Sequence, residues 1–210
     1  MSSSPAGARA GRIRWGVLAG SAMLLLLPAP AHAHLVTTGL GPLYDGISHV
    51  LLSPDDLLPV LAMALLAGLN GPAAGRGALF LLPLAWALGG LAGFEARSAL
   101  LPAAVTSASF LALGLLTAAD RRLSPALVAS LAVAFGLLHG WLNGAGIATA
   151  GREALALAGI VAAVFVLVAL VAAFVVSLRA PWARIVVRVA GSWIAAIGLL
   201  MLGWSLRGGS

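Results

Sequence analysis

Residues 43–69 read LYDGISHVLLSPDDLLPVLAMALLAGL, an apolar segment with a helix start near its centre. Ser53 is a typical N-cap residue and Pro54 suits the first helical position. Asp55 and Asp56 follow in the first turn, where the helix dipole favours acids. A helix from Pro54 to the end of this segment would be about 24 Å long, shorter than the hydrocarbon core of about 30 Å. The sequence therefore predicts a broken first helix, whose earlier half dips into the membrane or packs over it.

The rest of the chain is also apolar. Of its 210 residues, 61% are hydrophobic and 9% are charged, and apolar runs longer than a bilayer crossing recur along it. Short polar stretches divide the chain after residue 42 into about six apolar segments, near 43–69, 78–94, 99–118, 124–141, 154–178 and 183–205. The pattern predicts an all-α, polytopic integral membrane helix bundle with about six transmembrane helices.

The first 33 residues have the pattern of a cleavable signal peptide. Three arginines precede a short apolar stretch, and the sequence A-H-A at 31–33 fits a cleavage site. Cleavage after Ala33 would make His34 the mature N-terminus. Cleavage after Ala31 and an uncleaved first helix are the alternatives. We therefore predict a signal peptide over 1–33 and a single transmembrane domain over 34–210.

Composition excludes several classes of protein. All 12 basic residues are arginines, and most of them lie at the ends of apolar segments, where topology needs them, so the net charge of +6 does not indicate a nucleic-acid partner. The arginine bias predicts that both ends of the mature chain lie outside. The absence of cysteine excludes disulfides and thiolate metal sites. There is no Ser-His-Asp or H-E-x-x-H pattern, so we predict neither an enzyme nor an organic cofactor.

The ionisable residues are concentrated rather than scattered. The candidates for a functional site are His34, His49, Asp55, Asp56 and, at the outer end of the fourth segment, His139. Because ionisable groups are costly in lipid, their concentration indicates a function. Imidazole and carboxylate together suit nickel, cobalt or zinc. The glycines at 136, 140 and 144 would allow close helix packing around the last histidine.

Each candidate also has an interpretation without metal. Asp55 and Asp56 could serve only the helix N-terminus. His139 could be a polar link between helices, and His49 could be solvated near the interface. His34 could chelate metal through its α-amine and ring after cleavage, or lie at a solvated chain end.

Several of these residues resemble the motifs of the HupE/UreJ family of hydrogenase and urease accessory membrane proteins. The signal ends in A-H-A-H, and residues 135–140 read F-G-L-L-H-G. The family motif H-P-x-x-G-x-D-H aligns with residues 49–56, where His49 and Asp55 match and Asp56 replaces the second histidine. His139 matches the later motif, whereas Asn143 stands where some relatives have a further histidine.

The resemblance implies a bacterial inner-membrane protein that handles nickel or cobalt for metalloenzyme maturation. The donor chemistry leaves zinc as an alternative metal. The signal peptide and the arginine bias predict a mature N-terminus on the periplasmic face. We predict that His49, Asp55 and His139 are metal ligands and that Asp56 is a ligand or orients one. The expected partners are the lipid bilayer, the metal ion and maturation proteins. The alternative is a membrane scaffold that holds a maturation partner without transporting metal.

Overall fold

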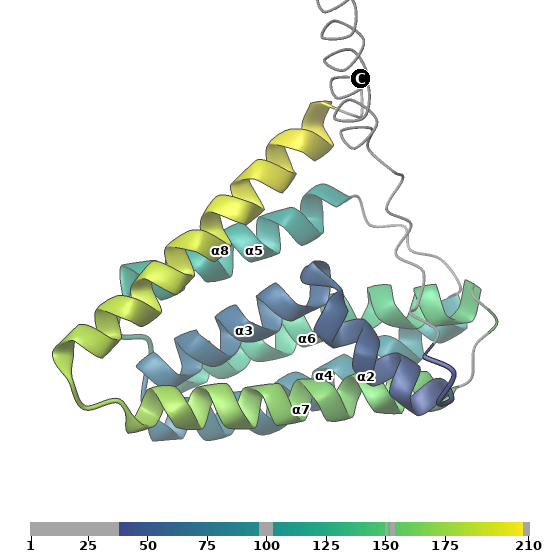
Figure 1. The fold of residues 1–210 in the computed structure, drawn as a ribbon, viewed down its shortest axis with the longest axis horizontal. Coiled ribbons are helices and arrows are strands. Elements are labelled where there is room, and N and C mark those ends of the chain that lie inside the picture. The colour runs from purple at the N-terminus through teal and green to yellow at the C-terminus, as the bar shows by residue number, and fades with distance from the viewer. Residues whose placement is uncertain (1–37, 97–102, 150, 152–153, 208–210) are drawn as a thin grey trace, which may run out of the picture. The chain divides into compact units, whose positions relative to one another are not determined.

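The computed structural model describes residues 38–96, 103–149, 151 and 154–207. The regular structure of this part of the chain is helical, as predicted (Figure 1). The helices are α2 (Pro42–Leu52), α3 (Pro54–Leu69), α4 (Pro72–Ala96), α5 (Ala103–Ala119), α6 (Pro125–Thr149), α7 (Ala154–Ser177) and α8 (Pro181–Arg207).

The predicted break in the first helix is confirmed. Helices α2 and α3 meet at an angle of 71° around the single residue Ser53. Ser53 has an extended backbone, and Pro54 has no N–H with which to continue the hydrogen bonds of α2. A new helix therefore begins at Pro54 in a different direction.

Helix lengths agree with a multi-pass membrane protein. In the described part of the chain, α4, α6, α7 and α8 are each long and apolar enough to cross a membrane. The bent pair α2 and α3 makes a fifth candidate if it is taken as one span, and α5 is a shorter apolar helix of 17 residues. These six units correspond to the six predicted segments.

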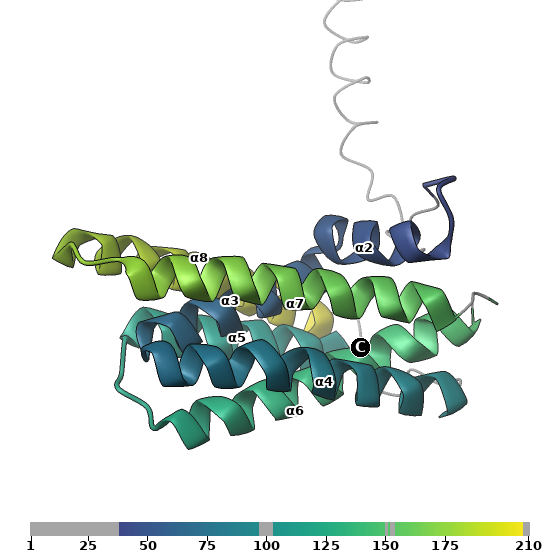
Figure 2. The same cartoon turned by 90° about the horizontal axis from the view of Figure 1, so that it is seen from below.

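The helices pack in pairs that bring distant parts of the sequence together. Helix α4 packs along α6, α5 packs along α8, and both α2 and α3 contact α7. The turns that join α3 to α4, α5 to α6 and α7 to α8 lie at one end, on the left of Figures 1 and 2. The α2–α3 break and the C-terminal half of α6 lie away from that end.

Helix α6 is longer than predicted. We expected the fourth segment to end near residue 141, but α6 continues to Thr149 through the glycine-rich stretch. Gly140 and Gly144 lie directly against the main chain of Trp86 and Gly90 on α4. Inside a membrane such glycines allow two helices to approach closely and do not end a helix. This extension keeps Asn143 on a helix, four residues from His139.

Candidate functional site

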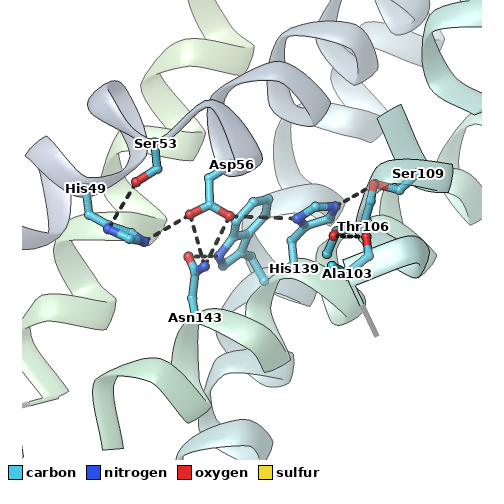
Figure 3. Close-up of polar contacts among 9 residues, drawn as sticks. His49, Ser53, Asp56, Ala103, Thr106, Ser109, His139 and Asn143 are labelled. Atoms are coloured by element: carbon cyan, nitrogen blue, oxygen red, sulfur yellow. Dashed lines mark hydrogen bonds and ion pairs between the residues drawn. The ribbon is translucent and has the colours of Figure 1, made fainter. Parts of the chain in front are cut away.

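Asp56 is at the centre of a buried polar cluster. It lies in the first turn of α3 and is only 4% exposed. His49 approaches it from α2, and His139 and Asn143 approach it from α6 (Figure 3). Three side chains, one from α2 and two from α6, therefore meet at the Asp56 carboxylate. We define Asp56 and these three residues as the Asp56 cluster.

His49 bridges the helix break. Its Nε2 lies 3.1 Å from Oδ2 of Asp56, and its Nδ1 lies 3.3 Å from the hydroxyl of Ser53. Ser53 occupies the N-cap position of α3, as predicted, but its side chain makes no cap hydrogen bond. Its hydroxyl instead contacts the imidazole and can either donate to Nδ1 or accept from it. Ser53 can therefore support either tautomer of His49.

His139 is held more tightly. It is 1% exposed, and its ring stacks with those of Trp86 and Phe110 at centroid distances of 5.5 and 6.2 Å. Its Nε2 lies 2.9 Å from the hydroxyl of Ser109 on α5, and its Nδ1 lies 3.7 Å from Oδ1 of Asp56. Each ring nitrogen therefore faces a different polar partner.

The partners of Ser109 determine which nitrogen of His139 carries the proton. The Ser109 hydroxyl has one proton and donates it to the carbonyl of Thr106, 2.6 Å away. It must then accept a hydrogen bond from Nε2–H of His139. In the neutral ring this leaves the Nδ1 lone pair facing the Asp56 carboxylate. A second proton on the ring would make His139 and Asp56 an ion pair across 3.7 Å, and a cation between them would interact with the same two atoms.

Ser109, His139 and Asp56 follow one another in the order of a catalytic triad, but the hydrogen bond that Ser109 donates differs from that of a triad serine. In such a triad the serine proton points to the imidazole. Here it points to a main-chain carbonyl of the same helix, and Ser109 is only 5% exposed. Ser109 thus orients His139.

Asn143 and Trp86 complete the surroundings of the carboxylate. Nδ2 of Asn143 lies 3.1 and 3.0 Å from the two oxygens of Asp56. Oδ1 of Asn143 accepts a hydrogen bond of 3.2 Å from the indole N–H of Trp86 on α4. In the described residues no buried side-chain nitrogen or oxygen lacks a hydrogen-bond partner.

The predicted candidates are only partly brought together. His49, Asp56 and His139 join in one cluster, whereas Asp55 is exposed at the start of α3. His34 lies outside the described residues. Within the described ranges, no three histidine or acidic side chains are already gathered around one point as a metal-binding group. His49 and His139 instead face different oxygens of the same carboxylate.

Three residues of the cluster and its surroundings were not predicted as site residues: Asn143, Ser109 and Trp86. Asn143 follows His139 by four residues, so the two share a face of a helix that includes both. The sequence would have indicated Asn143 if the helix had been predicted to continue beyond residue 141. Ser109 and Trp86 carry no comparable signal, because they come from two further helices whose packing brings them to the cluster. Their positions could be learned only from the fold.

The fold and the cluster define a class of protein: a helical, multi-pass membrane protein with a buried histidine and aspartate cluster beside a broken helix. The sequence model of the HupE / UreJ protein family matches residues 22–201, so the chain belongs to this family. No curated protein and no solved structure matches the chain.

Proposed function

We propose that this protein binds a divalent transition-metal ion of the nickel and cobalt class from the periplasmic face and admits it through the bacterial inner membrane. The ion would supply the maturation of a metalloenzyme such as hydrogenase or urease. Membership in the HupE/UreJ family supports this proposal. The observation that carries it is the placement of His139 Nδ1 and Asp56 Oδ1, two atoms of metal-ligating type that face each other across 3.7 Å in a buried site.

The distances within the cluster suit a shared ion. An ion of the zinc type lies about 2.0–2.2 Å from its nitrogen and oxygen ligands, which separates two neighbouring ligand atoms by roughly 3.0–3.6 Å. The separations of 3.1 Å between His49 and Asp56 and 3.7 Å between His139 and Asp56 lie within or close to that range. A small movement of either side chain would bring it to an ideal position.

Asp56 belongs to both pairs, so we infer two successive positions for the ion. The first is formed by His49 and Asp56, and the second by Asp56 and His139. Exposure falls along this order, from 8% for His49 to 4% for Asp56 and 1% for His139. An ion captured beside the helix break would therefore pass to the deeper position without leaving the carboxylate.

Metal uptake by proteoliposomes that contain the purified protein tests the proposal. We expect nickel or cobalt to accumulate inside the vesicles in the presence of wild-type protein and not with Asp56→Asn. The same variant should lower metal affinity by more than the roughly 10- to 100-fold that is typical when only a supporting partner of a ligand is lost. Uptake equal to that of empty vesicles would refute transport.

The neighbouring aspartate provides a matched control. Asp55→Asn removes the same charge from the same helical turn, but at an exposed position. We expect Asp55→Asn to retain uptake and to have a metal affinity within about threefold of that of wild type, because an exposed charge is well screened. A strong loss of metal binding in Asp55→Asn together with normal binding in Asp56→Asn would contradict the proposal. It would instead support Asp55 as the ligand, as predicted from the sequence.

A second candidate function is a membrane scaffold for a maturation partner. One observation favours it: the buried polar side chains of the described residues are satisfied without a metal ion. In that case the cluster serves helix packing, and variants of His49 or His139 should lower the melting temperature equally with and without nickel. A ligand that prefers the folded protein must raise its stability. Metal-dependent stabilisation of the wild type therefore separates the two functions.

A further inference from the structure

We infer that Trp86 determines the metal selectivity of the Asp56 cluster by fixing the orientation of the Asn143 side-chain amide, so that the amide oxygen cannot bind the ion. We call this fixed amide orientation the lock. The effect on metal selectivity rests on the proposed function, whereas the lock itself does not require metal. Trp86 and Asn143 are positioning residues in this proposal and do not themselves bind the metal.

The chemistry of the two neighbours fixes the orientation of the amide. An indole N–H can only donate, so the atom of Asn143 that lies 3.2 Å from Trp86 Nε1 must be the oxygen. A deprotonated carboxylate can only accept, so the atom near Asp56 must be the nitrogen. A rotated amide would place two donors together at Trp86 and two acceptors together at Asp56. Both contacts oppose the rotation.

The lock is protected by burial. Trp86 is 1% exposed and Asn143 is 8% exposed, so water has little access with which to replace a lost bond. The Trp86 ring is also held on its other side, since it stacks with His139 at 5.5 Å. One indole therefore positions both an imidazole and the amide that supports the carboxylate.

The consequence is a restricted set of ligands. With its nitrogen towards Asp56, Asn143 cannot offer an oxygen to an ion held by that carboxylate. The ion then meets imidazole nitrogen and a single carboxylate, a combination that suits nickel, cobalt and zinc. Ions such as manganese and magnesium prefer carboxylate, carbonyl and water oxygens. Freeing the amide would add a carbonyl oxygen and favour these harder ions.

Trp86→Phe tests the inference because it removes the N–H and retains an aromatic ring for stacking on His139. We expect the ratio of nickel affinity to manganese affinity, measured by titration of the full mature chain in detergent, to fall about five- to tenfold. That is the change expected for the loss of one hydrogen bond. Trp193→Phe is the matched control, since Trp193 is 69% exposed on α8, and it should leave the ratio unchanged.

Asn143 provides the second half of the test. In an Asn143→Leu background, Trp86→Phe should no longer change the nickel to manganese ratio, because residues in one network act non-additively. If Trp86→Phe lowers the affinity for both metals equally, or lowers only the melting temperature, Trp86 has a purely structural function and the inference is wrong.

A metal-free measurement separates this inference from the proposed function. In nitrogen-15 spectra of the metal-free protein, the Trp86 indole N–H resonance should shift when Asn143 is replaced by leucine, and those of exposed tryptophans should not. A Trp86 resonance that is unaffected refutes the lock, whatever metal the protein binds. A wild-type protein that shows the lock but binds no divalent metal contradicts the proposed function and, with it, the selectivity.

Discussion

The main chain of Gly140 on α6 lies directly against the carbonyl group of Trp86 on α4, with no room for a side chain between them. This contact fixes the level at which the two helices cross. One residue before the glycine, His139 reaches its stacking position on the Trp86 ring. Three residues after it, Asn143 meets the indole N–H. Close packing of α4 and α6 is therefore a condition for the Asp56 cluster.

This contact predicts a large difference between two glycines of the same helix. A Cβ at position 140 would collide with main-chain atoms of Trp86, whereas one at Gly146 would meet nothing within 4 Å. We expect Gly140→Ala to lower the free energy of unfolding by about 1–3 kcal/mol through overpacking. Gly146→Ala should be neutral or stabilise the protein by up to about 1 kcal/mol, since alanine favours helix. Thermal unfolding in detergent would measure both, and equal behaviour would contradict the observed helix contact.

The assignment of Ser109 as a hydrogen-bond acceptor predicts a second difference. Ser109→Ala leaves Nε2–H of His139 without its partner, so we expect a loss of about 1–3 kcal/mol in stability. Nickel affinity should fall by about 10-fold or more, because the imidazole is no longer oriented. The control is Ser107→Ala on the same helix. Ser107 is also buried but donates only to the Ala103 carbonyl, and metal affinity should remain unchanged there.

Membrane topology can be tested with introduced cysteines, because the chain has none of its own. Arg122 lies exposed in the turn before α6, and Thr149 lies exposed at the end of that helix. If α6 crosses the membrane, Arg122→Cys and Thr149→Cys should react with an impermeant maleimide from opposite faces. The arginine bias predicts that Thr149→Cys reacts from the periplasmic side. Reaction of both from one side would contradict the transmembrane assignment of α6.

The processing prediction concerns residues outside those that the structure describes. We expect the mature protein to begin at His34, and N-terminal sequencing of protein purified from membranes would measure this directly. A start at His32 would support the alternative cleavage after Ala31. Recovery of an intact Met1 would contradict the signal peptide and remove the possibility of an N-terminal chelate.

The sequence by itself determined the helical class, the approximate limits of the apolar segments and the break at Ser53. These are local properties. Apolar runs must form helices in lipid because every backbone group needs a partner there. Pro54 cannot continue the hydrogen bonds of the preceding helix. The spacing of Gly136, Gly140 and Gly144 likewise predicted a close helix contact, which α4 provides.

Only the tertiary structure decided which aspartate belongs to the cluster. Asp55 and Asp56 are adjacent, and neighbouring residues on a helix point about 100° apart, so the two side chains face different directions. Their order along the chain does not say which one faces the bundle. Packing against α6 buried Asp56 and left Asp55 exposed. Trp86 and Ser109 could not be predicted as neighbours of the Asp56 cluster for the same reason. Contacts between separate helices depend on packing geometry, which no local sequence pattern encodes.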